Sequence, residues 1–89
     1  MNTSASWTVI LAGPAKKALK RIPPSDRDRI HAALAEMGAD PFRGDVKYLQ
    51  GRKDTLRRRV GKWRIFFRLV QEEKQLLVSA IARRTSTAY

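Results

Sequence analysis

The sequence predicts an α+β fold, in which an N-terminal strand, a helical hairpin and a three-stranded antiparallel meander build one small sheet with the helices on one face. Three observations predict it: a β-branched run at 7–11, two segments with apolar residues at helical spacing between 14 and 38, and three strand-like segments after residue 54. The 89 residues have the size of one small domain, so we expect residues 1–89 to fold as a single unit.

The helical hairpin is predicted by the placement of prolines and by two apolar stripes. Pro14 suits the first turn of a helix, where a missing N–H costs nothing, and Pro23 with Pro24 ends that helix. Asp26 then lies favourably near the positive end of a second helix, which we expect to stop at Gly38. The residues expected to be buried are Ala15, Ala18, Leu19 and Ile22 in the first helix and Ile30, Ala33, Leu34 and Met37 in the second.

The segment after the second helix is predicted to be a loop that leads into the meander. Residues 40–53 contain a proline and two glycines, and we expect Phe42 and Leu49 to anchor this loop to the core. The three strands are expected at 55–60, 63–70 and 75–82, because these segments combine β-branched and aromatic residues with short turns between them.

The register of the first hairpin follows from its turn. Gly61 and Lys62 form a two-residue loop with glycine first, which fits a type II′ turn and places Arg59 opposite Arg64. Residues that face each other share a side of the sheet, and the sides alternate along each strand. One face then carries Arg57, Arg59, Arg64, Phe66 and Arg68, and we expect this face to be open and cationic. The other face is the core, with Val60, Trp63, Ile65, Phe67 and Leu69, and with Arg58 as its one misfit.

The composition excludes several classes of chemistry. The chain has no cysteine and one histidine, which rules out disulfides, thiol nucleophiles, thiolate metal sites and pairs of catalytic histidines. We therefore expect no cofactor and no metal, and we expect His31 to lie on a helix surface. No apolar run is long enough to span a bilayer, and the first six residues lack the apolar centre of a signal peptide. We expect a cytoplasmic protein that does not bind membranes.

The charge predicts a polyanionic partner. Nineteen Lys and Arg against eight Asp and Glu give a net charge of +11. Residues 43–68 hold ten basic and two acidic side chains, which is 10 − 2 = +8 within 26 residues. Such a field attracts nucleic acid first, anionic membranes second and acidic proteins third, although a solvated basic surface has the same composition.

Arg59 directly opposite Arg64 is a poor choice for stability. Like charges that face each other across two strands are destabilising. Two interpretations stay open: both guanidinium groups extend into water, or they bind an anion, for which the planar guanidinium fork is well suited. Phe66, on the same face, is either a surface on which a base stacks or half-buried packing.

Four segments carry a family resemblance. They are the opening strand, the Lys-Arg-Ile-Pro-Pro junction between the helices, the run Leu-Arg-Arg-Arg-Val-Gly-Lys-Trp-Arg-Ile-Phe that starts at Leu56, and the ending from Arg83 to Tyr89. Over nearly the whole chain they resemble the RelE/ParE toxin superfamily of bacterial type II toxin–antitoxin systems. The chain looks most like the RelE-type mRNA interferases of that superfamily.

The resemblance implies a ribosome-dependent endoribonuclease that cuts mRNA in the ribosomal A site without a metal. Carried over position by position, it implies a catalytic set consisting of Arg57, Arg59, Arg64, Arg83 and Tyr89. We expect Arg83 to leave the last strand towards the face that carries Arg59 and Arg64. Relatives often have lysine at the two positions on the predicted strand 55–60, and arginine is much harder to deprotonate. We place the RNA- and ribosome-binding residues around this set, at Arg52, Lys53, Lys62, Phe66, Arg68 and Arg84.

Two other functions stay open on the sequence. The strand–hairpin signature is shared across the superfamily, so a ParE-like inhibitor of DNA gyrase without nuclease activity fits it too, as does an inactive relative that only binds nucleic acid. The spacing from Arg83 to Tyr89 favours the RNA-cutting branch. The resemblance also implies a cognate acidic antitoxin that forms a heteromeric complex with this chain, in addition to the ribosome and mRNA as targets.

Overall fold

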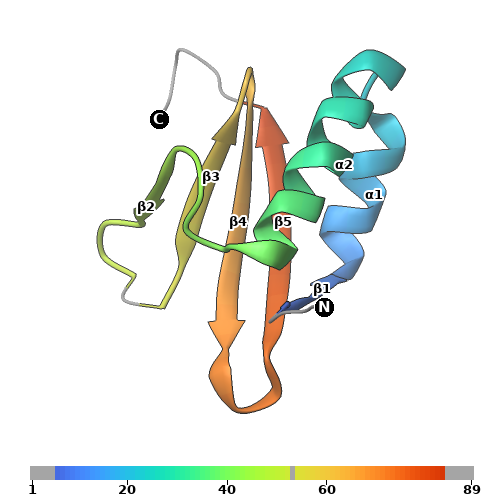
Figure 1. The fold of residues 1–89 in the computed structure, drawn as a ribbon. Helices are drawn as coiled ribbons and strands as arrows, with labels where there is room; N and C mark the ends of the chain where they lie inside the picture. Colours follow the sequence, from blue (N-terminus) through green and yellow to red (C-terminus); the bar gives the residue numbers. More distant parts are fainter. Residues whose placement is uncertain (1–5, 53, 84–89) are drawn as a thin grey trace.

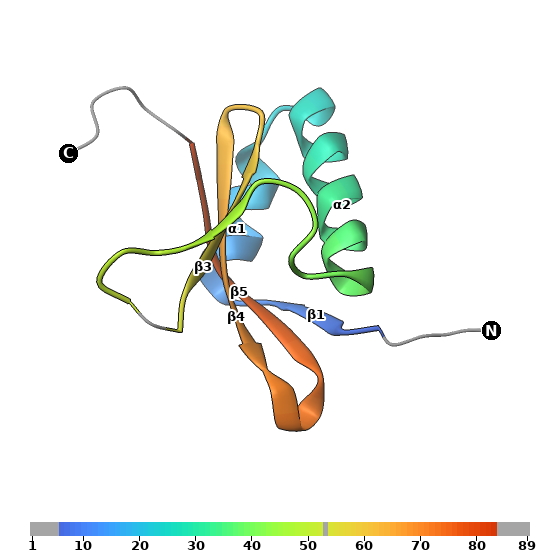
Figure 2. The same cartoon turned by 60° about the vertical axis from the view of Figure 1, so that its left-hand side comes forward.

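The computed structural model describes residues 6–52 and 54–83, and it has the predicted α+β fold. Within these residues, five strands form one sheet in the order β1-β5-β4-β3-β2, in which β1 runs parallel to β5 and the other neighbours are antiparallel. Both helices pack on the same face of this sheet (Figures 1 and 2). The elements are β1 (Thr8–Leu11), α1 (Gly13–Arg21), α2 (Pro24–Ala39), β2 (Val46–Tyr48), β3 (Leu56–Val60), β4 (Trp63–Val70), a 3-10 turn (Gln71–Glu73) and β5 (Gln75–Arg83).

The link between the helices consists of two residues held by the prolines, as predicted. Ile22 and Pro23 each precede a proline and take extended backbone angles, with ψ of 137° and 149°. Lys20 and Arg21 lie in the last turn of α1 and Asp26 lies in the first turn of α2, so the charges at this junction complement the dipoles of both helices.

The core lies between the helices and the sheet, and it contains both predicted apolar stripes. Ala18 is only partly buried, and both tryptophans, Trp7 and Trp63, pack half-buried against the core. The side chains that are fully buried and largest are Phe67, Ile22, Ile30, Met37, Ile65, Leu76 and Val78. The predicted core face of the β3–β4 hairpin is therefore the face that meets the helices.

Gly38 does not end the second helix, contrary to the prediction. The helix runs to Ala39, and Gly38 is buried in its last turn. The Trp7 N–H donates to the Gly38 carbonyl at 2.7 Å, and a Cβ at Gly38 would lie 3.3 Å from the Trp7 carbonyl oxygen. Gly38 therefore lets the start of β1 approach the helix closely.

The segment predicted as a loop, 40–53, contains a short edge strand. β2 pairs antiparallel with β3 over three residues and extends the sheet beyond the predicted meander. Phe42 is 54% exposed, so the prediction that it anchors this segment to the core is wrong. Leu49 is half-buried, and its N–H donates to the Thr55 carbonyl at 2.8 Å.

The β3–β4 hairpin has the predicted register. Arg59 pairs with Arg64, and Arg58 pairs with Ile65. Gly61 has φ of 57°, as the first position of a type II′ turn requires. The predicted arrangement of side chains on the two faces of this hairpin is therefore confirmed.

The pairing of β4 with β5 contains a bulge that the sequence analysis did not predict. Phe66 pairs with Ala80 and Phe67 pairs with Val78, which leaves Ser79 as an extra residue on β5. One extra residue reverses the alternation of side chains after it. Ile81, rather than Ala80, is accordingly buried in the core.

Candidate functional site

The site is built on the open face of the sheet, by which we mean the face opposite the helices. Two rows of side chains cross it. In the first row, the Arg59 N–H donates to the Asp45 carbonyl at 3.0 Å, and Arg59 pairs with Arg64 on β4. In the second row, Lys47 on β2 pairs with Arg57 on β3. Cations from three adjacent strands therefore gather on this face.

Asp45 supplies the negative charge that the opposed arginines lack. Its carboxylate lies 3.7 Å from a guanidinium nitrogen of Arg59 and 3.7 Å from one of Arg57. Arg64 makes no ion pair within the described residues, and its Nε is buried without a hydrogen-bond partner there. In these two rows, the cations without an ion pair to a described residue are therefore Lys47 and Arg64.

Arg57 is less open than the sequence analysis expected. Its side chain is 11% exposed, whereas the Arg59 side chain is 41% exposed. The prediction of an open row of arginines is wrong for Arg57, because this side chain is largely covered and is paired with Asp45. Arg59 and Arg64 are the two members of the predicted catalytic set that the register brings directly opposite each other.

Arg58, the predicted misfit on the core face, is held by a specific pair of contacts. It is 8% exposed, and its Nη2 donates to Oε1 of Glu36 on α2 at 2.8 Å. Gly44 covers it from the loop before β2, where a Cβ would lie only 2.8 Å from the Arg58 Cζ. Gly44 has φ of 88°, which also favours glycine. Arg58 is thus a structural arginine that ties α2, β3 and this loop together.

The Arg58 contact also affects the titration of Glu36. The hydrogen bond from Arg58, with the charge of its guanidinium, lowers the pKa of Glu36 below its ordinary value of 4.5. Glu36 therefore keeps its charge, and its bond to Arg58, to a lower pH than an isolated glutamate would.

Arg83 does not point where the sequence analysis expected. We predicted that it leaves β5 towards the face of Arg59 and Arg64. The register instead pairs Arg83 with Trp63, and the Trp63 Nε1–H donates to Asp26 of α2 at 3.1 Å, so both lie on the helix side of the sheet. The bulge at Ser79 is the physical reason, because it reverses the alternation along the rest of β5.

The predicted binding residues do not form one continuous rim. Lys62 lies exposed in the β3–β4 turn, whereas Arg52 lies exposed before β3, at the opposite end of that strand. Phe66 is half-buried on the open face, and Arg68 is exposed and pairs with Asp54 at 3.5 Å. Three other predicted site residues, Lys53, Arg84 and Tyr89, lie outside the described residues.

Three residues near this surface were not predicted from the sequence. Lys47 and Asp45 were assigned to a loop, although a polar residue beside apolar Val46 is the weak signal of an edge strand. Arg29 of α2 lies against the β3–β4 turn, where a Cβ on Gly61 would be 3.3 Å from its Nη1. No pattern in the sequence predicts that contact, because it depends on how α2 packs on the sheet.

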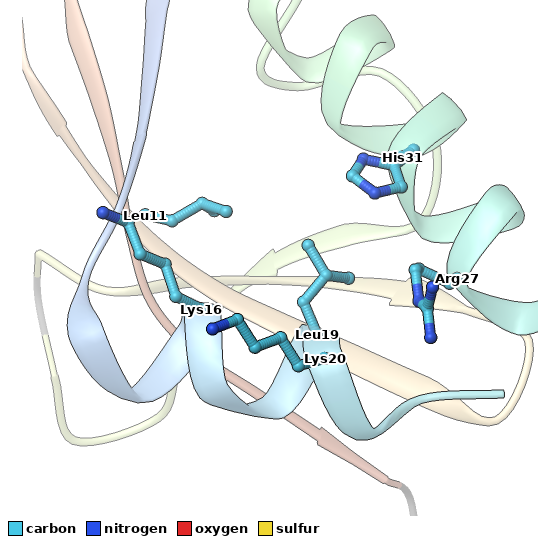
Figure 3. A pocket seen from close by; sticks show the side chains of 6 residues that line it. All are labelled: Leu11, Lys16, Leu19, Lys20, Arg27 and His31. Carbon is cyan, nitrogen blue, oxygen red and sulfur yellow. The ribbon is translucent and has the colours of Figure 1, made fainter. Parts of the chain in front are cut away.

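A second surface feature is a hollow of about 350 Å³ between the two helices. Its apolar floor and basic rim come from the end of β1 and from both helices, as Figure 3 shows. The lining residues are Leu11, Lys16, Leu19, Lys20, Arg27 and His31. His31 is exposed, which confirms its predicted place on a helix surface.

Two further observations concern metals and membranes. Among residues 6–52 and 54–83, no group of three or more His, Cys, Asp or Glu side chains is arranged to hold a metal ion. In the same ranges, neither helix has the length and apolar character needed to cross a bilayer.

The fold is shared with solved toxin structures. The chain is similar to the toxin–antitoxin complex RelBE2 of Mycobacterium tuberculosis, with a TM-score of 0.81 and 21% identity over 90% of this chain and 100% of that one. It is similar to the archaeal RelE–RelB complex of Pyrococcus horikoshii OT3, with a TM-score of 0.79 and 20% identity over 93% and 100% of the two chains. The isolated RelE toxin of E. coli gives a TM-score of 0.80 and 14% identity over 92% and 88%.

A small basic α+β domain with an open cationic sheet face thus shares its fold with these solved RelE structures. The model of the family described as "ParE toxin of type II toxin-antitoxin system, parDE" matches residues 9–87. The chain therefore belongs to this family, and with it to the RelE/ParE superfamily. A sequence search of curated proteins finds no match.

Proposed function

We propose that this toxin is a ribosome-dependent mRNA endoribonuclease of the RelE type, which inhibits translation. The observation that carries the proposal is the opposition of Arg59 and Arg64 on the open face, with Arg64 uncompensated by any acidic residue of the described chain. Two arginines placed against each other are unfavourable unless an anion binds between them. Guanidinium groups bind phosphate through two parallel hydrogen bonds, so a phosphodiester is the anion that this pair suits.

The proposed reaction needs positioning and charge stabilisation. The RNA 2′-oxygen attacks the adjacent phosphorus and loses its proton, while the 5′-oxygen leaves and takes up a proton, which gives a 2′,3′-cyclic phosphate. Arg59 and Arg64 donate hydrogen bonds to the non-bridging oxygens, where negative charge grows in the transition state. Arginine is a poor base, so the proton transfers fall to other groups. The family resemblance suggests Tyr89 for one of them, and the ribosome is our candidate for the rest.

The remaining predicted site residues have secondary places in this proposal. Arg57 supports Arg59 through their shared partner Asp45. Arg83 lies at the end of β5, on the helix side of the sheet and close to the β3–β4 turn. There it contacts the RNA or the ribosome in this proposal. A comparison of Tyr89→Phe with Tyr89→Ala decides the role of the tyrosine: activity in Phe alone indicates stacking on a base, and loss in both indicates proton transfer.

We also propose a cognate antitoxin as the partner that keeps the toxin inactive. The solved relatives include toxin–antitoxin complexes, and the family description names such a system. The net charge of +11 favours an acidic, partly disordered chain that folds on binding. Its amphipathic helix would find an apolar floor and a basic rim in the hollow between α1 and α2. Co-expression of such a protein should relieve growth arrest, whereas full tolerance of the lone chain at high expression would contradict the toxin proposal.

One specific observation favours a second candidate, because the matching family model carries the ParE name. Two assays on the purified chain separate the candidates: cleavage of a reporter mRNA in a reconstituted translation system, and supercoiling by DNA gyrase. We expect mRNA to be cut only in the presence of translating ribosomes, with gyrase unaffected. Gyrase inhibition with intact mRNA would instead show a ParE-like inhibitor.

A further inference from the structure

We infer that Asp45 is an internal counter-ion of Arg59 on the open face and competes with the RNA phosphate for that arginine. The inference rests on the proposed function in one respect, namely that the incoming anion is a phosphodiester. Its structural basis is the first row of the open face, where Asp45 on the β2 side adjoins Arg59, and Arg59 faces Arg64. A carboxylate is therefore already placed beside the arginine pair that suits phosphate.

Asp45 makes ion pairs with two arginines of β3. Its two carboxylate oxygens lie 3.7 Å from Arg57 and from Arg59, one oxygen on each. Arg64 lies on the opposite side of Arg59, on β4, and has no acidic partner among the described residues. A phosphate that binds between Arg59 and Arg64 must therefore compete with Asp45 for the Arg59 guanidinium.

Backbone hydrogen bonds fix the position of Asp45, and its side-chain contacts are not needed for this. The Arg59 N–H holds its carbonyl at 3.0 Å, and the Val46 N–H donates to the Gly44 carbonyl at 3.0 Å. On the other face of the sheet, Gly44 lies against the buried guanidinium of Arg58, which is bonded to Glu36. Consecutive arginines of β3 thus hold this loop from both faces, Arg58 from the core side and Arg59 from the open side.

A substrate phosphate can replace the Asp45 carboxylate beside Arg59, because the ion pairs of Asp45 are weak. The Asp45 side chain is 48% exposed, and contacts of 3.7 Å are longer than hydrogen-bonded ion pairs. Exposed pairs of this kind contribute little, so a doubly hydrogen-bonded phosphate replaces them readily. Asp45 is therefore a positioning residue that sets how strongly the site binds an anion.

The chain offers a matched control in Asp54. Asp45→Asn and Asp54→Asn change the net charge equally. The first removes the ion pairs to Arg57 and Arg59, and the second removes the ion pair to Arg68, which is also an arginine of the sheet. Asp54 pairs with Arg68 at 3.5 Å, away from the row that contains Arg59 and Arg64. A difference between the two variants therefore reports the local role of Asp45 and not the overall field.

The first experiment titrates inorganic phosphate into each protein at constant ionic strength and follows the side-chain NMR signals of Arg59 and Arg64. We expect Asp45→Asn to bind phosphate about 2- to 5-fold more tightly than the wild type, the range that loss of an exposed ion pair allows. Asp54→Asn should differ from the wild type by less than about 1.5-fold at these two arginines, since its own ion pair lies elsewhere. Equal changes in both variants, no tightening in Asp45→Asn, or no response of either arginine to phosphate would overturn the inference.

The second experiment measures binding of a single-stranded 2′-O-methyl RNA, which cannot be cleaved, as a function of salt. If Asp45→Asn frees one arginine for one more phosphate contact, its log–log salt slope steepens by up to about 0.7, and that of Asp54→Asn changes less. An unchanged slope in Asp45→Asn would contradict the competition. If both experiments give the expected difference but mRNA stays intact on ribosomes, the proposed nuclease function fails while the counter-ion role of Asp45 stands.

Discussion

Arg58 and Arg59 are neighbours in β3, and they differ in almost every respect except residue type. Arg58 points to the helices, is 8% exposed and has a bonded partner in Glu36 at 2.8 Å. Arg59 points to the open face, has a 41% exposed side chain and faces another arginine. The comparison teaches that the side of the sheet decides which arginines hold the fold together and which are available to a ligand.

The same difference extends over both faces. On the helix side, Arg58 is the buried cation among the described residues, and it is paired with Glu36. On the open side, two carboxylates, Asp45 and Asp54, accompany a larger number of cations, and their contacts are 3.5 Å or longer. Within the described residues, the open face of the sheet therefore combines loosely paired arginines with Arg64, which has no acidic partner there.

The largest expected effect concerns the open face. Arg64→Ala should slow mRNA cleavage by about 10²–10³-fold, because it removes one oriented donor to the phosphate. The protein should remain folded, and loss of the repulsion with Arg59 should leave its stability equal or slightly higher. Growth arrest on expression tests the first expectation, and thermal unfolding of the purified variant tests the second. Arrest by Arg64→Ala at the wild-type expression level would contradict the role of the open face.

The next effect concerns the glycine that covers Arg58. Gly44→Ala places a Cβ about 2.8 Å from the Arg58 Cζ at a backbone φ of 88°. We expect a loss of unfolding free energy of about 1–3 kcal/mol, since strain and steric overlap act together. Urea unfolding measures this loss. Gly51→Ala is the matched control, because Gly51 has a similar φ of 83° with no atom within 4 Å of an added Cβ. Equal losses in the two variants would show that backbone strain alone matters.

A smaller effect is expected when the buried arginine itself is replaced. Arg58→Met keeps an apolar stem in the core but removes the bond to Glu36, which should lower the unfolding free energy by about 1–2 kcal/mol. The half-exposed Glu36 carboxylate remains hydrated, and this limits the loss. Chemical unfolding at neutral pH checks the value. A variant as stable as the wild type would show that the pair with Glu36 adds no net stability.

The smallest effect is the pH dependence of this pair. Because Arg58 lowers the pKa of Glu36, the pair contributes stability that is fully present above about pH 4.5 and is lost as the pH falls through the lower, folded-state value. Glu36→Gln should remove this contribution. The difference in urea midpoint between wild type and variant should therefore shrink between pH 7 and pH 3. A constant difference over that range would contradict the linkage.

The accuracy of the sequence analysis differed between regions for physical reasons. The β3–β4 register was predictable because a two-residue turn with glycine first fixes which residues face each other. β2 was missed because three residues are too few for a periodic pattern, and Asp45 was missed with it. The partners of Arg58 were not predictable, since Glu36 is 22 residues away and only the packing of α2 brings it near.

The wrong side of Arg83 has a cause that is visible only in the folded strand, because the sequence of β5 keeps an apolar residue at every second position from Leu76 to Ala82. In β5 the buried positions are Leu76, Val78 and Ile81, so the spacing changes from two residues to three. That change is the signal of a bulge, and the extra residue is Ser79, whose hydroxyl donates to the Phe66 carbonyl at 3.2 Å. A strict alternation from Leu76 places Arg83 on the open face, and the bulge places it on the helix side.

The central claim is that the open face cuts mRNA and that the covered arginine only supports the fold. The most direct test is the rate of reporter mRNA cleavage on translating ribosomes by wild type, Arg58→Met and Arg64→Ala, at equal concentrations of folded protein. The account predicts that Arg58→Met cleaves within about 3-fold of the wild type, while Arg64→Ala is slower by about 10²–10³-fold. Equal rates for wild type and Arg64→Ala, or an equal loss in both variants, would contradict it.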